Sequence, residues 1–118
     1  MREMLKSKIH CATLTETELE YEGSITIDPA LMEAAGLVPF EKVLVANVSN
    51  GERLETYVIE GESGSGTVCL NGAAARRAHR GDKVIIMSFC LVDEAKRQEW
   101  QPTIVVVDEK NQITEIRR

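Results

Sequence analysis

Aromatic residues, paired cysteines and long apolar runs are all scarce in this sequence. Aromatic side chains make up only 4% of the 118 residues, so a hydrophobic core has to be aliphatic. The cysteines, Cys11, Cys69 and Cys90, are odd in number, widely spaced and without a Cys-x-x-Cys pair. Because there are also only two histidines, we expect neither a disulfide framework nor a metal site.

The sequence also lacks the features of a membrane or nucleic-acid-binding protein. Its longest apolar run, residues 84–92, is interrupted by Ser88 and is far shorter than a membrane span. Residues 1–8 are too polar for a secretory signal. The net charge of −5 argues against a nucleic-acid partner, and we interpret Arg76, Arg77 and Arg80 as the solvated face of a helix. We therefore expect a soluble, cytoplasmic protein.

The chain contains an internal repeat. Each copy has the pattern of a strand, an N-capping residue, an alanine-rich helix, a turn and a second strand. The first copy comprises residues 24–30 and 39–45, and the second comprises residues 67–73 and 80–86. Such a unit cannot bury its apolar face alone, but two copies can close on each other. We therefore predict a mainly β, six-stranded barrel with short helices and pseudo-twofold symmetry.

Turn signals predict two hairpins within one domain of residues 1–118. Asn50-Gly51 lies between apolar runs 43–48 and 54–59, and Asn-Gly is a strong hairpin signal. Residues 103–108 and 112–116 are expected to form a second hairpin at the C-terminal end. The chain has no linker and no low-complexity tract, and its length fits a single domain.

Gly23-Ser24 is the most informative pair in the sequence. Leu19, Tyr21, Ile25 and Ile27 share one parity, so we expect one strand face to continue through this bond. A glycine in mid-strand often marks a tight bend, and glycine tolerates unusual dihedral angles. A serine hydroxyl held beside the preceding carbonyl at such a bend could attack it, although the pair alone is typical of an ordinary turn.

Three further blocks accompany this pair: Lys8-Ile9-His10, Arg53-Leu54-Glu55-Thr56-Tyr57 and Asn71-Gly72-Ala73-Ala74-Ala75. In this order and spacing, the four blocks resemble the aspartate 1-decarboxylase family, pyruvoyl-dependent enzymes that make β-alanine for pantothenate and coenzyme A biosynthesis. The resemblance covers about residues 2–92. It implies a double-psi β-barrel, in agreement with the repeat.

The resemblance also implies how a cofactor is made. In the family, the hydroxyl of Ser24 attacks the Gly23 carbonyl, the amide becomes an ester, and elimination and hydrolysis cut the chain. The products would be a β-chain of residues 1–23 and an α-chain of residues 24–118 that begins with a pyruvoyl group. This covalently bound pyruvate would form a Schiff base with L-aspartate, which then loses its 1-carboxylate as CO2.

The family roles carry over to the matching side chains. Thr56 would assist cleavage and contact the substrate, Tyr57 would donate a proton to the carbanion, and Arg53 and Lys8 would bind the substrate carboxylates. Further substrate contacts would come from Gly72, Ala73 and Ala74, and supporting positions are His10, Tyr21 and Asn71, the last as an N-cap. By strand parity Arg53 and Tyr57 share a face and Thr56 points to the other. Cys11 stands where family members commonly carry arginine, so a basic contribution from that position is missing.

The resemblance further implies a homotetramer with sites between adjacent subunits, and it leaves open whether a maturation factor assists cleavage. Two alternatives are a non-catalytic binding module on the same barrel and a pyruvoyl decarboxylase of another amino acid. The joint presence of Ser24, Tyr57, Arg53 and Lys8 argues against a binding module. Two cations suit a dicarboxylic substrate, which favours aspartate.

Overall fold

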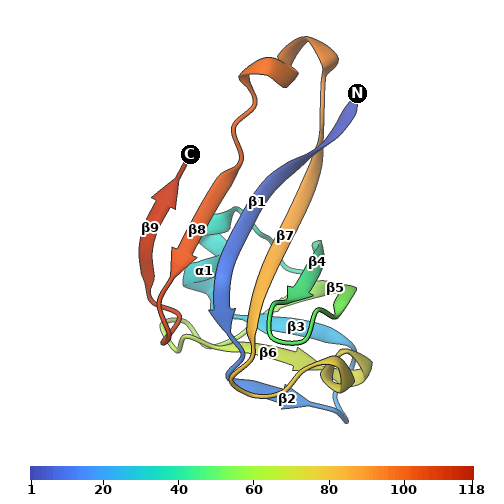
Figure 1. Cartoon of the computed structure of the whole chain (residues 1–118), viewed down its shortest axis with the longest axis vertical. Coiled ribbons are helices and arrows are strands. Elements are labelled where there is room, and N and C mark those ends of the chain that lie inside the picture. Colours follow the sequence, from blue (N-terminus) through green and yellow to red (C-terminus); the bar gives the residue numbers. More distant parts are fainter.

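The computed structural model describes all 118 residues and contains nine strands, one α-helix and two 3-10 helices (Figure 1). The strands are β1 (Arg2–Thr13), β2 (Glu16–Glu18), β3 (Ser24–Ile27), β4 (Lys42–Asn47), β5 (Arg53–Glu60), β6 (Val68–Asn71), β7 (Lys83–Val92), β8 (Thr103–Val107) and β9 (Ile113–Arg117). The helices are α1 (Pro29–Ala35), η1 (Gly72–Arg77) and η2 (Glu94–Glu99). Strands β1, β7 and β8 run lengthwise, while β2, β3 and β6 cross below them (Figure 1).

Strands β1 to β7 form a closed ring. The strands pair in the order β2-β6-β3-β5-β4-β7-β1, and only Leu14 and Thr15 separate β1 from β2. If β1 and β2 are taken as one broken strand, the ring closes with the six strands that the repeat predicts. The predicted C-terminal hairpin is also present, because β8 pairs with β9 and adds to the free edge of β1.

The strand register shows the predicted pseudo-twofold relation. Strand β3 pairs antiparallel with its repeat equivalent β6, and Thr26 lies opposite its own counterpart Cys69. Strand β4 pairs antiparallel with its equivalent β7, and Val45 lies opposite its own counterpart Ile86. Equivalent residues lie opposite each other only where a twofold axis passes between them, so the pseudo-twofold axis passes through the midpoint of each of these two pairs.

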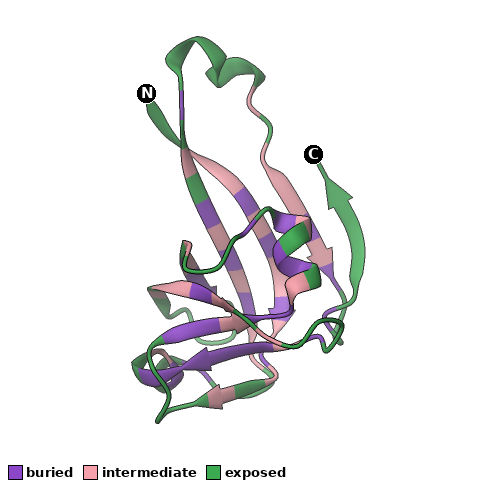
Figure 2. Cartoon of the chain, turned by 180° about the vertical axis from the view of Figure 1, so that it is seen from behind, coloured by how far each residue is buried: buried purple, intermediate pink, exposed green.

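The barrel interior is aliphatic, as the shortage of aromatic residues requires. None of the 19 residues of the buried core cluster is aromatic. Ile9, Ile25, Val58 and Val84 are fully buried, and each such side chain contributes roughly 1.5–3 kcal/mol when it leaves water. Figure 2 shows that β3 and β6 are buried along most of their length. No helix is long and apolar enough to cross a membrane.

The two predicted helix caps differ. The Asp28 carboxylate accepts a hydrogen bond from Ala30 N at the start of α1 and two more from Gly64 N and Gly66 N. Burial opposes the charge of Asp28, but these three bonds outweigh it and hold its pKa below the ordinary value. Asn71 occupies the predicted N-cap position, but η1 is a 3-10 helix and the Asn71 side chain makes no capping bond.

The prediction of one strand face through the Gly23-Ser24 bond was wrong. Strand β2 pairs with one edge of β6 and β3 pairs with the other. Because a continuous strand cannot lie on both edges of β6, the chain turns between residues 18 and 24. Leu19 and Tyr21 are consequently exposed, whereas Ile25 and Ile27 are buried.

Candidate active site

A surface hollow of about 550 Å³ lies where the turn before β3, strand β5 and the start of η1 meet. Its lining includes six of the predicted site residues, namely Gly23, Arg53, Thr56, Tyr57, Ala73 and Ala74. Three sequence blocks that are far apart along the chain are therefore brought to one place. The predicted cleavage point borders this hollow.

The strand pairing explains this convergence. Strand β3 lies between β5 and β6, parallel to the first and antiparallel to the second. Ser24 is the first residue of β3 and pairs directly with Asn71. Ile25 pairs with Val58, so the preceding residue of β5, Tyr57, lies at the same end of the ladder as Ser24.

Both faces of β5 contribute to the hollow. Thr56 lies opposite Val43, a core residue, whereas Tyr57 lies opposite the exposed Lys42 on the outer face. The parity prediction for these side chains is thus correct. Nevertheless Thr56 and Tyr57 both line the hollow, so Thr56 reaches it within the same chain.

The Ser24 hydroxyl is buried and held in place by a hydrogen-bond network. Its Oγ accepts a hydrogen bond of 2.9 Å from Asn71 Nδ2 and donates one of 3.1 Å to the carbonyl of Glu22. Asn71 Nδ2 also donates to Thr26 Oγ1, at 2.8 Å. Asn71 therefore supports Ser24 directly with its side chain, which replaces the predicted role as a helix cap.

The site depends on glycine at position 72 more than at position 23. Gly72 has a φ of +65°, and a Cβ there would lie 2.7 Å from both Gly23 N and Tyr21 O. A Cβ on Gly23 would meet nothing within 4 Å, and its φ is not positive. The expected need for an unusual dihedral angle at Gly23 is therefore not found, and the close approach of two backbones occurs at Gly72.

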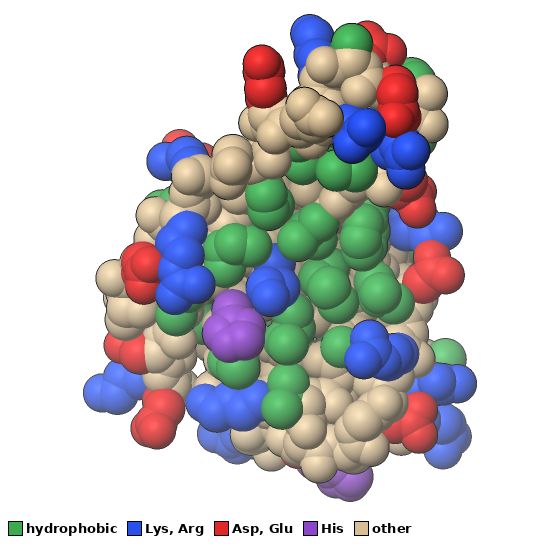
Figure 3. Space-filling model, turned by 45° about the horizontal axis from the view of Figure 1, so that its top comes forward, with side chains coloured by type: hydrophobic (Ala, Val, Ile, Leu, Met, Phe, Trp, Pro, Cys, Tyr) green, Lys and Arg blue, Asp and Glu red, His purple; other side chains and the backbone are tan.

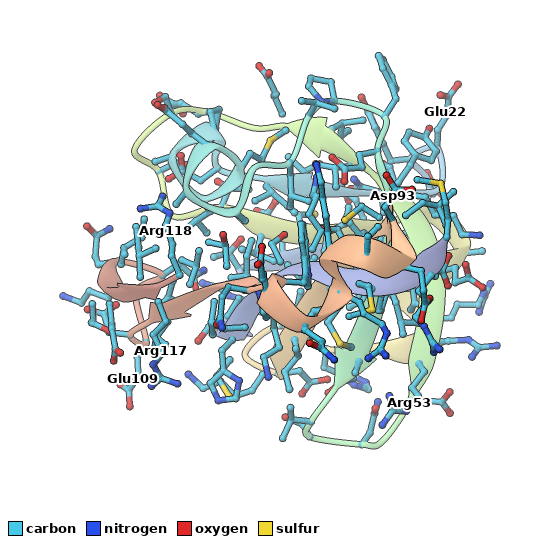
Figure 4. All side chains as sticks on the ribbon, turned by 90° about the horizontal axis from the view of Figure 1, so that it is seen from above. Glu22, Arg53, Asp93, Glu109, Arg117 and Arg118 are labelled. Atoms are coloured by element: carbon cyan, nitrogen blue, oxygen red, sulfur yellow. The ribbon has the colours of Figure 1, made fainter.

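The hollow has a basic rim that sequence reasoning recognised only in part. Arg53 projects at the outer edge of the molecule (Figure 4), and Arg77 lines the same hollow. Arg77 Nη1 donates to Glu52 Oε2 at 3.2 Å and to the Arg53 carbonyl at 3.1 Å. The interpretation of Arg77 as part of a solvated helix face missed this contact, since nothing in the sequence relates η1 to β5. Guanidinium groups suit a carboxylate ligand.

Lys8 and His10 do not lie at this hollow. Through the strand pairs Lys8–Met87, Met87–Leu44 and Leu44–Glu55, Lys8 is three strands away from β5. At a strand spacing of about 4.8 Å this is on the order of 14 Å. Within one chain, the predicted substrate contact of Lys8 is therefore not formed.

His10 has unusual surroundings. Its Nδ1 atom is buried without a hydrogen-bond partner, and its Nε2 lies 3.4 Å from Cys11 Sγ. Cys11 has a φ of +59°, which is uncommon for a residue with a side chain. The predicted support of the site by His10 is not seen within the chain, and Tyr21 is exposed and does not line the hollow.

The outer face of the barrel near Lys8 is apolar. Figure 3 shows hydrophobic side chains gathered on the face formed by β1, β7 and β8. Phe89 and Leu91 on β7 are 42% and 63% exposed. A face of this kind is typical of a surface that is covered by a partner.

Comparison with known proteins identifies a family. The family model described as aspartate decarboxylase matches residues 1–114. An aspartate 1-decarboxylase of Syntrophus aciditrophicus is 61% identical over 112 residues, which cover 95% of this chain and 97% of that protein. One of Caldicellulosiruptor saccharolyticus is 60% identical over 114 residues, which cover 97% and 89% of the two chains.

A solved structure is similar in fold. It is the crystal structure of the rationally designed protein mkDPBB_sym_86, with a TM-score of 0.50 and 20% sequence identity. The match covers 65% of this chain and 90% of the designed one. At this identity it shows the fold alone, and it confirms the predicted double-psi β-barrel.

Proposed function

The chain belongs to the aspartate decarboxylase family, and we propose that it cleaves its own Gly23–Ser24 bond and then converts L-aspartate to β-alanine and CO2. Its product would serve pantothenate biosynthesis. The cleavage would leave chains of residues 1–23 and 24–118. The observation that carries the proposal is the buried Ser24 hydroxyl, fixed by Asn71 beside the scissile bond at the edge of a basic hollow.

The cleavage is an intramolecular acyl shift. Ser24 Oγ adds to the Gly23 carbonyl carbon, the C–N bond breaks, and the hydroxyl proton passes to the Ser24 nitrogen. The resulting ester then loses the Ser24 α-proton, which releases the Gly23 carboxylate and leaves dehydroalanine, and water converts that residue to a pyruvoyl group and ammonia. An amide is a poor electrophile, so pre-alignment is decisive, and it can supply roughly 7–11 kcal/mol.

The residues present fit a pyruvoyl group at position 24. The position is buried at the start of β3, and the preceding residue faces the hollow with open space around it. A pyruvoyl group supplies a covalently held electron sink for the loss of a carboxylate. The surrounding protein then has to bind the substrate, orient it and return a proton.

Three features of the hollow support these tasks. Arg53 offers a guanidinium fork to a substrate carboxylate. Ala73 and Ala74 have short side chains that leave room for the substrate beside Gly72. The Tyr57 phenol lines the hollow and can donate a proton to the carbon that has lost CO2.

The proposal includes assembly into a homotetramer. Lys8 is about 14 Å from β5 of its own chain by strand spacing, yet it lies on the same outer face as Arg53 and Tyr57. A second copy that covers the apolar face of β7 is the proposed source of the Lys8 and His10 that act at this hollow. The proposed compartment is the cytoplasm, where the three unpaired cysteines stay reduced.

The first test is the intact mass of the purified wild-type chain and of Ser24→Ala, followed by an assay of β-alanine from L-aspartate. The wild type should separate into one fragment that ends at Gly23 and a second fragment whose mass shows a pyruvoyl group at its N-terminus. Ser24→Ala should stay whole and inactive. A cut Ser24→Ala chain would contradict the cleavage mechanism. A wild type that is cut but inactive on aspartate would indicate another amino acid, and one that stays whole in cell extract would indicate a binding module.

A further inference from the structure

Cys69 is connected to Ser24 through the side chain of Asn71, by one hydrogen bond on each side of the amide. It lies in β6 opposite Thr26, and only 5% of its surface is exposed. Its Sγ donates to Asn71 Oδ1 at 3.3 Å, and Asn71 Nδ2 donates to Ser24 Oγ at 2.9 Å. The Leu70 carbonyl is a more distant acceptor for the same thiol, at 3.8 Å.

We propose that Cys69 is a positioning residue for self-cleavage, because its thiol fixes the orientation of the Asn71 amide toward Ser24. The inference rests on the proposed function, since it concerns the rate of the same acyl shift.

Two partners of Asn71 favour this orientation of the amide. The Ser24 hydroxyl donates its proton to the Glu22 carbonyl, so it faces Asn71 as an acceptor, whereas the Thr26 hydroxyl can donate or accept and is compatible with both orientations. A thiol is a weak acceptor, and its proton needs a partner. Burial and the charges of Glu16 and Glu18 raise the pKa of Cys69 to about 11, so the thiol keeps its proton at neutral pH. Asn71 Oδ1 therefore faces Cys69 and Nδ2 faces Ser24.

This orientation matters because the serine oxygen changes character during the reaction. When Ser24 Oγ bonds to the Gly23 carbon, its proton leaves and the oxygen can only accept hydrogen bonds. An N–H group of Asn71 facing Oγ holds the oxygen in place as its proton leaves and remains compatible with the ester oxygen that forms. In the reversed amide, Oδ1 would face Oγ and repel it. Cys69 thus disfavours the reversed amide, which would slow the shift.

The test is the rate of cleavage of freshly purified, uncut chains, followed by intact mass, for wild type, Cys69→Ala, Cys69→Ser and Cys90→Ala. Cys69→Ala should cleave more slowly by roughly three- to tenfold, the scale of one lost neutral hydrogen bond. Cys69→Ser restores a donor and should cleave within about twofold of wild type. Cys90, a free cysteine on β7 away from the network, controls for the loss of a thiol and should have no effect.

The outcomes separate the inference from the proposed function. Equal rates for wild type and Cys69→Ala would overturn the inference alone, and so would equally slow cleavage by Cys69→Ala and Cys69→Ser, because only packing would then matter. A wild type that never cleaves would overturn the proposed function and the inference with it. If Cys69→Ala does not fold, as judged by thermal denaturation, Cys69→Val fills the volume without a donor and takes its place.

Discussion

Replacing Gly72 by alanine should impair both folding and self-cleavage. Gly72 has a φ of +65°, and its Cα faces the backbone of the turn that precedes β3. An added Cβ would lie 2.7 Å from Gly23 N, 2.7 Å from Tyr21 O and 2.8 Å from Gly23 Cα. These are backbone atoms, so no side chain can rotate away to relieve the contact.

The size of the effect follows from two costs. The left-handed conformation costs an alanine about 1–2 kcal/mol, and inserting a methyl group into a closely packed site costs about 1–3 kcal/mol more. The sum of about 2–5 kcal/mol corresponds to a fall in melting temperature on the order of 10 °C for a domain of this size. If the turn instead shifts by about 1 Å to make room, the scissile carbonyl is displaced from Ser24, and such a shift can slow a reaction about 100-fold.

Gly51→Ala is the matched control. Gly51 has a φ of +79° but open space around a Cβ, so its substitution carries the conformational cost without the contact. The first assay is thermal denaturation of both variants, each combined with Ser24→Ala so that the chain stays uncut. The second assay is the rate of self-cleavage of both variants with Ser24 intact, followed by intact mass. Gly51→Ala should lose about 1–2 kcal/mol and cleave normally. If Gly72→Ala were as stable as Gly51→Ala and cleaved at the wild-type rate, the close approach at Gly72 would have no role.

Three further variants test the proposed roles. Tyr57→Phe should still be cleaved but lose at least about 100-fold in turnover, the scale of general acid catalysis, and near-normal turnover would remove Tyr57 from that role. Arg53→Lys keeps the charge but loses the planar fork, so the Michaelis constant for aspartate should rise; an unchanged constant would argue against carboxylate binding there. Asp28→Asn should be destabilised at pH 7, because the wild-type carboxylate has a lowered pKa and its contribution is present above the ordinary value of 3.8. That contribution is lost as the pH falls through the lower folded value, so denaturant titrations should show the two stabilities converging below pH 3.8, and a constant gap would contradict the assignment.

Local patterns in the sequence predicted the fold where one element determines its own geometry. Asn50-Gly51 indicated the β4–β5 hairpin, and Asp28 indicated the start of α1. The repeat indicated the six barrel strands, because two similar units must bury each other's apolar faces. The break between β2 and β3 was missed, since it depends on which two edges of β6 are occupied.

The site was predictable only in part, for a similar reason. Arg53, Thr56 and Tyr57 belong to one strand, so their proximity follows from their spacing. The contact of Arg77 with β5 and the bond from Asn71 to Ser24 join distant segments, and spacing carries no information on them. The self-pairing of the repeats was the one available signal, because it places Thr26 opposite Cys69 and so Ser24 opposite Asn71.

The broken first strand has a consequence for reversibility. Residues 1–23 contain both β1 and β2, which pair with β7, β8 and β6 and so close the ring. Before the proposed cleavage, the folding of each barrel is unimolecular, because a barrel is a single chain. After that cleavage the same barrel would consist of two polypeptides, so its recovery from denaturant would become bimolecular and its apparent stability would depend on protein concentration. The individual barrel of the precursor should therefore re-form equally well at any dilution, whereas the barrel of the cleaved protein should re-form less completely as it is diluted.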